Sequence, residues 1–304
     1  LTQANDLALI VTSANLSGGT IIGDEDDGML QLSQLADLVV SHNRKIEMKI
    51  DDSVMLVSAG HDIFLRRARG ITPKPFYFSY KLPQVLALGA HLKNTICYTR
   101  ENKAFMSQPF GDMSSEHTIK YFKATLAHYK KIFNFKPELI VTDLHPDFFV
   151  RQYAEEFNLP QLQLQHHFAH FASVIANAES CGKKVENLVL GCILDGYGYG
   201  LNGEAWGGEL IQFNRDNLSF ELISQLPTLQ TPGGDIAETE PWRIALAMCV
   251  QNSLPIPEHL LQHQQSDMVV NLIKCKYFAT SSSMGRYFSG IAALLNILSI
   301  SSYE

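Results

Sequence analysis

The chain is poor in cysteine and has no apolar run long enough to span a bilayer, and both absences narrow the class of protein. Its five cysteines are odd in number and never spaced C-x-x-C, which argues against a disulfide framework and a thiolate zinc site. This usage suits a reducing compartment, so we expect a cytoplasmic protein with no membrane partner. No signal-peptide pattern opens the sequence. The first residue is Leu1, so we expect that a leader has been removed or that the chain is an excerpt.

Positive charge is also scarce. Lysine and arginine number 24 against 31 aspartate and glutamate, a formal net charge of −7. A broad phosphate-tracking surface is therefore disfavoured, and no nucleic-acid partner is expected. Hydrophobic residues make up 46% and charged residues 18% of the 304, which predicts a packed core in one large domain or two ordinary ones.

The expected elements fall on the two sides of a proline-rich linker at Thr72–Pro75. Before it we expect strands at Leu7–Thr12, Leu38–Ser41 and Val54–Val57 and a helix at Met29–Ala36. After it we expect strands at Val85–Leu88, Thr95–Tyr98, Ala104–Met106, Leu139–Val141 and Leu162–Leu164, and helices at Glu116–Phe133, Phe149–Phe157 and from His166. Strands at Leu188–Leu194, Glu204–Phe213 and Phe220–Ser224 and a helix at Ile236–Val250 begin the pattern again. The sequence thus predicts an α/β protein with two copies of one unit, an arrangement that generally binds ligands between its copies.

The sharpest chemical pattern is Gln165-His166-His167-Phe168-Ala169-His170. On a helix, His166 and His170 share a face one turn apart, as two imidazoles must in order to bind one ion. It is not the zinc-protease motif, because His167 stands where that motif has its glutamate. Eleven histidines make a chance pair ordinary, and a half-buried helix with hydrogen-bonded histidines explains the spacing as well. Spacing alone leaves both interpretations open.

Two further patterns suggest a ligand. Asp195 follows the apolar run Leu188–Leu194 and is followed by glycines, a place for a metal ligand or for backbone amides that contact phosphate, although an empty hairpin fits too. The runs Thr12–Asn15 and Arg66–Arg69 offer hydroxyls, an amide and guanidinium groups for a nucleotide or carboxylate, although a solvated basic stretch also accounts for the arginines.

Taken in order, these residues resemble the HypF family of hydrogenase-maturation carbamoyltransferases. The matching runs are Thr12–Gly18, Asp51–Val54, Arg66–Gly70, Leu86–Ala90, Lys93–Thr95, Gly111-Asp112, Asp143–Pro146, His166–His170, Leu194–Gly196, Trp206–Glu209, Pro232–Asp235, Glu240–Arg243 and Ser282–Arg286. No single run is decisive, but the ordered series covers nearly the whole chain.

The resemblance implies the end of a YrdC-like α/β domain at residues 1–78, followed by a carbamoyltransferase domain at 79–304. That domain would have the actin/Hsp70/sugar-kinase (duplicated RNase H-like) fold, with a first lobe at about 79–183 and a C-terminally truncated second lobe at about 184–304. It implies a divalent metal, zinc or iron, at His166, His170 and Asp195. The nucleotide-binding residues implied are Ser13, Asn15, Arg66, Arg69, Gly196, Gly198, Gly207, Gly208, Gly233, Gly234 and Asp235.

The implied reaction uses carbamoyl phosphate and ATP and transfers the carbamoyl group from an adenylate to the C-terminal cysteine of HypE, for a cyanide ligand of [NiFe] hydrogenase. Compared with the family pattern, we expect this stretch to be missing the acylphosphatase-like domain, the zinc-finger cysteine pairs, the first half of the YrdC-like domain and the last metal-binding aspartate. Ser289 stands where the family usually has aspartate. Two alternatives stay open: a threonylcarbamoyl transferase acting on tRNA, and a non-catalytic binding module.

Overall fold

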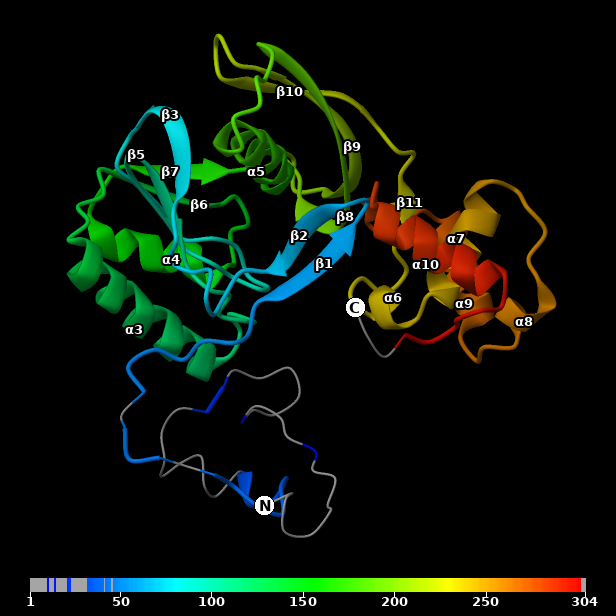
Figure 1. Cartoon of the computed structure of the whole chain (residues 1–304). Helices are drawn as coiled ribbons and strands as arrows, with labels where there is room; N and C mark the ends of the chain where they lie inside the picture. The colour runs from blue at the N-terminus through cyan, green and yellow to red at the C-terminus, as the bar shows by residue number, and fades with distance from the viewer. Residues whose placement is uncertain are drawn as a thin grey trace. The chain divides into compact units, whose positions relative to one another are not determined.

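The structure is a computed structural model of the chain and describes residues 10, 14, 21–22, 32–40, 42–44 and 46–301. The chain divides into two units, residues 1–163 and 164–304 (Figure 1). Among the described residues, every helix is too short or too polar to cross a lipid bilayer.

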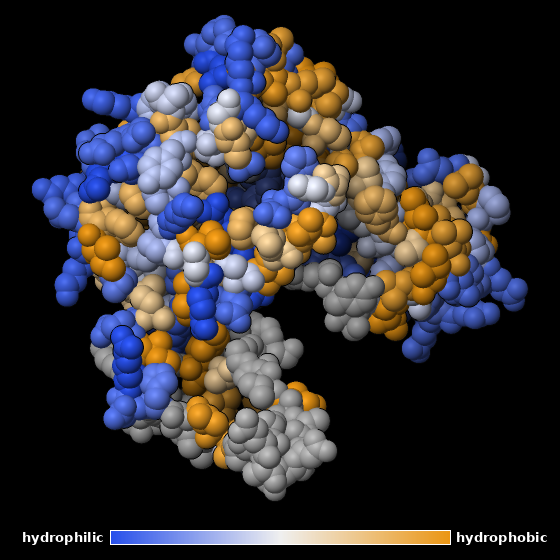
Figure 2. All heavy atoms as spheres, viewed as in Figure 1, coloured by the Kyte–Doolittle hydropathy of each residue, from blue (hydrophilic) through white to orange (hydrophobic). Residues whose placement is uncertain are grey.

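The first unit contains a separate two-stranded antiparallel hairpin of β1 (Val54–Ser58) and β2 (His61–Arg66). Apolar side chains of both strands are exposed; Val57 is 64% and Leu65 66% accessible. Orange, apolar surface is accordingly visible over the hairpin in Figure 2. Cross-strand pairing alone holds such a hairpin weakly, because it buries little apolar area.

The main sheet of the first unit has five strands in the order β3-β5-β4-β6-β7. Their bounds are Phe76–Leu82 for β3, Val85–Ala87 for β4, Cys97–Met106 for β5, Leu139–Asp143 for β6 and Gln161–Leu164 for β7. Strands β3, β5 and β4 are antiparallel, whereas β4 and β6 run parallel with Leu86 opposite Ile140. Both of these side chains are completely buried, so the parallel pair lies in the core.

Helices α3 (Glu116–Phe133) and α4 (Phe149–Ala154) belong to the same unit, and a 3-10 turn, η1 (Glu155–Phe157), follows α4. Phe122, Leu126 and Tyr129 recur at helical spacing on α3 and are buried in the unit's hydrophobic core. The predicted bounds of this helix are confirmed.

The second unit is built on a sheet in which β8 (Leu188–Tyr199) and β10 (Ser219–Gln225) both pair antiparallel with β9 (Ala205–Asn214). The short strands β11 (Leu229–Gln230) and β12 (Thr280–Ser281) extend it. Helix α5 (His166–Ser180) packs against the sheet through Phe171 and Ile175, which share a buried cluster with sheet residues. This packing brings the histidine helix next to β8.

The remaining helices of this unit are α6 (Ile236–Thr239), α7 (Trp242–Gln251), α8 (Glu258–Leu261), α9 (Ser266–Lys274) and α10 (Met284–Leu294). Leu246 of α7 and Ile273 of α9 are buried in a second apolar cluster that Ala293 of α10 completes. The opposite face of α10 is exposed, with Phe288 67% accessible.

Several predicted elements are wrong in their bounds. The strands predicted at Thr95–Tyr98 and Ala104–Met106 are one strand, β5, because paired neighbours on both sides keep its polar middle extended. Strand β3 was not predicted, and residues 38–40 form no strand. The helix predicted at Ile236–Val250 is divided into α6 and α7 at Pro241, which has no N–H to continue the helical ladder. The strand predicted at Leu7–Thr12 lies largely outside the described residues. So do the first three residues of the helix predicted at Met29–Ala36, of which residues 33–35 form a turn.

Candidate metal centre

The histidine helix starts at a well-defined cap. Gln165 precedes α5, and its side-chain oxygen accepts hydrogen bonds from the N–H groups of His167 at 2.7 Å and Phe168 at 3.0 Å. These are two of the donors that a helix leaves unpaired at its N-terminus. The Gln165 amide in turn donates to the carbonyl of Tyr199 at the end of β8. The N-terminal end of α5, which carries His166 and His170, is thereby tied to the strand that carries Asp195.

Asp195 leaves the regular ladder of β8. The pairing of β8 with β9 shifts between Leu194 and Gly198, and such an irregularity re-aims a side chain. The Gly196 N–H donates to Asp195 Oδ1 at 2.7 Å, which leaves Oδ2 directed at the histidines. Within the described residues, Oδ2 is buried and has no hydrogen-bond partner, so the site contains an orphaned carboxylate oxygen.

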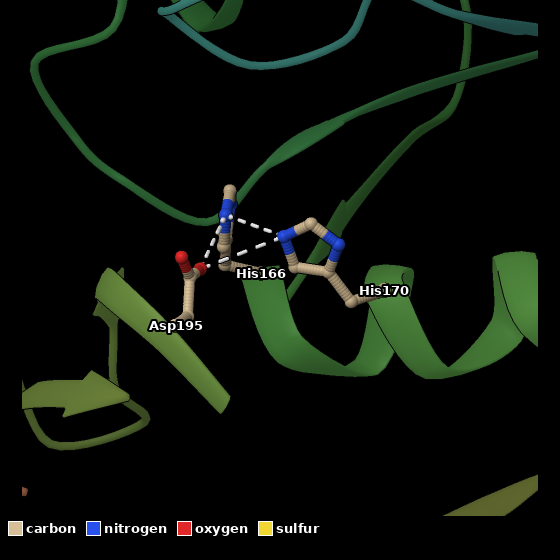
Figure 3. Close-up of side chains that lie close together, drawn as sticks. All are labelled: His166, His170 and Asp195. Atoms are coloured by element: carbon tan, nitrogen blue, oxygen red, sulfur yellow. Dashed lines mark hydrogen bonds and ion pairs between the residues drawn. The ribbon is translucent and has the colours of Figure 1, made fainter. Parts of the chain in front are cut away.

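Three ligand-type atoms converge at this point (Figure 3). The Nε2 atoms of His166 and His170 lie 3.1 Å apart, and they are 3.4 Å and 3.5 Å from Asp195 Oδ2. Two ligands held about 2.1 Å from a tetrahedral ion lie about 3.4 Å from each other, so the observed spacings match one coordination shell. The three residues form a group that could hold a metal ion. The donor set, two imidazoles and a carboxylate, suits zinc or ferrous iron.

The electrostatics keep the carboxylate ionised. Burial raises the pKa of Asp195, but the surrounding imidazoles of His166, His167 and His170 and the Gly196 amide outweigh it, so the pKa lies well below its usual range. The side chain of His170 is 55% accessible, so the cluster is open on one side. A metal bound here could accept a further ligand from solution.

A supporting pair behind the cluster was not singled out from the sequence. His167 is completely buried, and its Nδ1 lies 2.7 Å from Oε2 of Glu209 on β9. Its Nε2 lies 3.5 Å from Asp195 Oδ2. The run Trp206–Glu209 was noted for its glycines, but only the fold shows that its glutamate faces the histidine helix.

The predicted nucleotide-binding residues are scattered over both units. Ser13 and Asn15 lie outside the described residues. Arg66 lines a pocket of about 490 Å³ in the first unit together with Arg67 and Lys93, and it also pairs with Asp51 at 3.1 Å.

Arg69, by contrast, does not line that pocket. It donates to the carbonyl of Ile50 and lies 3.6 Å from Asp52. Arg66 and Arg69, which were predicted together as nucleotide-binding residues, therefore have different surroundings in the structure, and Arg66 alone of the two lines the pocket.

Four of the glycines predicted to bind nucleotide lie in strands rather than in turns. Gly196 and Gly198 lie inside β8 and Gly207 and Gly208 inside β9, because both strands continue through the glycines. A Cβ on Gly207 would lie 2.6 Å from the Asp195 carbonyl oxygen and from Ser283 Cα, so this glycine permits close strand packing.

Among the glycines predicted to bind nucleotide, Gly233 and Gly234 lie in a turn. Gly233 and Gly234 have φ of 97° and 60°, a left-handed conformation that favours glycine, and Asp235 follows them just before α6. Ser289 is half-buried on α10. Nucleotide contact by these glycines and Asp235 stays a prediction.

Comparison with known proteins assigns the segments. Residues 80–177 match the family described as HypF Kae1-like domain, and residues 191–304 match Carbamoyltransferase, Kae1-like Domain, second subdomain. Residues 1–68 match the Sua5/YciO/YrdC family, described as Telomere recombination. The matches confirm the predicted combination of a YrdC-like segment with a carbamoyltransferase domain.

The similarity extends over the whole chain. Carbamoyltransferase HypF of Rhizobium leguminosarum bv. viciae is 38% identical over 98% of the chain and 39% of its own length. Carbamoyltransferase HypF2 of Cupriavidus necator is 37% identical over 100% of the chain and 38% of its own length. A crystal structure of full-length HypF in the phosphate- and nucleotide-bound form superposes with a TM-score of 0.88 at 33% identity, covering 96% of this chain and 46% of that one. The chain spans about two fifths of the length of these curated relatives, and it belongs to the HypF family.

Proposed function

We propose that the chain acts in the transfer of a carbamoyl group from carbamoyl adenylate, made from carbamoyl phosphate and ATP, to the C-terminal cysteine of HypE. The product would serve the synthesis of the cyanide ligand of [NiFe] hydrogenase. The observation that carries the proposal is the convergence of His166, His170 and Asp195 in a chain similar to HypF proteins throughout. The five free cysteines agree with a reducing cytoplasm.

The cluster supplies what the chemistry needs. His166, His170 and Asp195 would hold a divalent metal, zinc or iron, whose chemistry at this place is Lewis-acid polarisation of a carbonyl. Asp195 stays ionised and so contributes negative charge to the site. The accessible side of His170 leaves room for a carbonyl oxygen to approach.

In the proposed step, the sulfur of the HypE cysteine attacks the carbamoyl carbon. The carbon–sulfur bond forms, the bond from that carbon to the adenylate oxygen breaks, AMP leaves with the bonding electrons, and the thiol proton passes to solvent. The nucleophile comes from the partner, so none of this chain's cysteines takes part. Two of them are poorly suited to the role in any case, because burial raises the pKa of the Cys97 and Cys249 thiols.

The first unit offers a place for phosphate. Arg66, Arg67 and Lys93 bring three positive side chains to one pocket, and guanidinium groups bind phosphate oxygens in a bidentate manner. The Arg67 guanidinium lies 3.9 Å over the ring of Phe76, which holds it in place. We infer that this pocket contributes to nucleotide binding.

A chimera tests the proposal. Residues 1–304 would replace the matching segment of the Rhizobium leguminosarum HypF, and the product would be incubated with carbamoyl phosphate, ATP and HypE. Mass spectrometry should find a carbamoylated C-terminal cysteine on HypE, and His166→Ala with His170→Ala in the chimera should abolish it. A folded chimera that binds ATP but leaves HypE unmodified, beside an active parent, would overturn the proposed transfer.

A further inference from the structure

We propose that Glu209 and His167 form a buried support that positions the Asp195 carboxylate for metal binding, with Ser282 holding Glu209 in place. The inference rests on the proposed metal site, since the pair touches Asp195 rather than the substrate. His167 and Glu209 would thus be positioning residues.

The His167 ring lies between two carboxylates. Its side chain is 0% exposed, with Nδ1 2.7 Å from Glu209 Oε2 and Nε2 3.5 Å from Asp195 Oδ2. Each nitrogen of the ring therefore faces a carboxylate oxygen, one of Glu209 on β9 and one of Asp195 on β8. A buried charge is tolerated only when it is paired, so the three side chains are mutually dependent.

Glu209 is itself fixed on both oxygens. Its Oε1 accepts hydrogen bonds from the Gly207 N–H at 3.1 Å and from the Ser282 hydroxyl, while Oε2 faces His167. Burial raises the pKa of Glu209, but His167, Ser282 and the backbone amides outweigh it and lower the pKa. The carboxylate therefore has one orientation, and it transmits that orientation to the imidazole ring.

Two glycines of β8 leave space for the His167 ring and hold the Asp195 carboxylate. A Cβ on Gly198 would lie 2.4 Å from His167 Nε2, so any larger residue at that position would displace the ring. On the other side, the Gly196 N–H holds Asp195 Oδ1. Asp195 is thus held from two directions, and Oδ2 is left facing His166 and His170. Partners of this kind, behind the direct ligands, commonly raise metal affinity about 10- to 100-fold.

A merely structural ion pair would make a different prediction. It would lower the stability of the metal-free chain when broken, yet leave the affinity and the coordination geometry of a bound metal unchanged. Cobalt(II) distinguishes the two roles, because its visible absorption reports the geometry of its ligands while chelator competition reports its dissociation constant.

The experiment compares the full chain with Glu209→Gln and with Glu221→Gln, the same substitution at an exposed position of the neighbouring strand β10. Glu209→Gln should weaken cobalt binding about 10- to 100-fold and change the visible spectrum. Glu221→Gln should match the wild type in both. Ser282→Ala, which removes one bond to Glu209 but keeps its charge, should weaken binding in the same direction by a smaller factor.

Cobalt affinity and spectrum unchanged in Glu209→Gln would overturn the inference, even if the metal-free variant unfolds more easily. If Glu209→Gln does not fold, an unchanged affinity in Ser282→Ala would overturn it instead. Failure of the wild-type chain to bind cobalt is a separate result, which would contradict the metal site itself and with it the proposed function.

Discussion

His166 on α5 and Asp195 on β8 face each other across a helix–strand contact, with Nε2 3.4 Å from Oδ2. The contact depends on tight packing of the two elements. A Cβ on Gly191 of β8 would lie 2.6 Å from the ring of Phe171 on α5, so only a residue without a side chain lets the helix come so close. The candidate site is therefore a product of how α5 docks on the sheet.

The two glycines of β8 beside this site provide a matched pair of substitutions. Gly198→Ala should lower the free energy of unfolding by about 1–3 kcal/mol, because its Cβ would meet the buried His167 ring. Gly196→Ala should change stability little, because its Cβ would meet nothing within 4 Å. Urea unfolding of the metal-free variants measures both. Equal effects of the two substitutions would refute the packing described around His167.

The five cysteines should differ in how fast their thiols are alkylated. Cys249 is 1% exposed and burial raises its pKa, and burial raises the pKa of Cys97 to about 11. Both thiols should therefore stay protonated at pH 8 and react slowly with an alkylating reagent. The exposed Cys181, Cys192 and Cys275 should be alkylated readily. Peptide mass spectrometry after brief iodoacetamide treatment gives the pattern. The urea-unfolded chain, in which all five should react, is the control, and fast labelling of Cys249 in the native chain would be inconsistent with the buried position.

The first-unit pocket predicts a difference between two arginines. Arg66→Ala should weaken ATP binding about tenfold or more, because a lost hydrogen bond to a charged group costs about 1.5–3 kcal/mol. Arg69→Ala should leave the affinity nearly unchanged, because that side chain is directed at Ile50 and Asp52. Calorimetric titration with ATP compares them. A larger loss from Arg69→Ala would place the nucleotide elsewhere.

Local patterns in the sequence predicted part of this structure well. The apolar spacing of α3 gave its bounds, and the spacing of His166 and His170 gave their shared helix face. Asp195 was joined to them by resemblance, and the structure brings its carboxylate to the two rings. These predictions succeeded because each rests on neighbours within one element or on an ordered series of motifs.

The parts of the fold and of the candidate site that were not predicted depend on contacts between residues far apart in the sequence. The pairing of His167 with Glu209 joins α5 to β9, and no local pattern distinguishes it from an ordinary buried histidine. As a sequence pattern, the glycines after Asp195 fit an empty hairpin, whereas in the structure Gly198 of β8 and Gly207 of β9 lie inside strands and allow close packing. The polar middle of β5 led to the prediction of two short strands, whereas pairing with neighbouring strands keeps the whole segment in one strand.

The central claim is that His166, His170 and Asp195 bind one divalent metal, and metal analysis by mass spectrometry tests it most directly. The wild-type chain, purified and dialysed, should hold about one zinc or iron ion, and His166→Ala with His170→Ala should hold almost none. His117→Ala with His128→Ala, which removes two histidines of α3, should retain the ion. Equal metal content in the wild type and the His166/His170 variant would contradict the account.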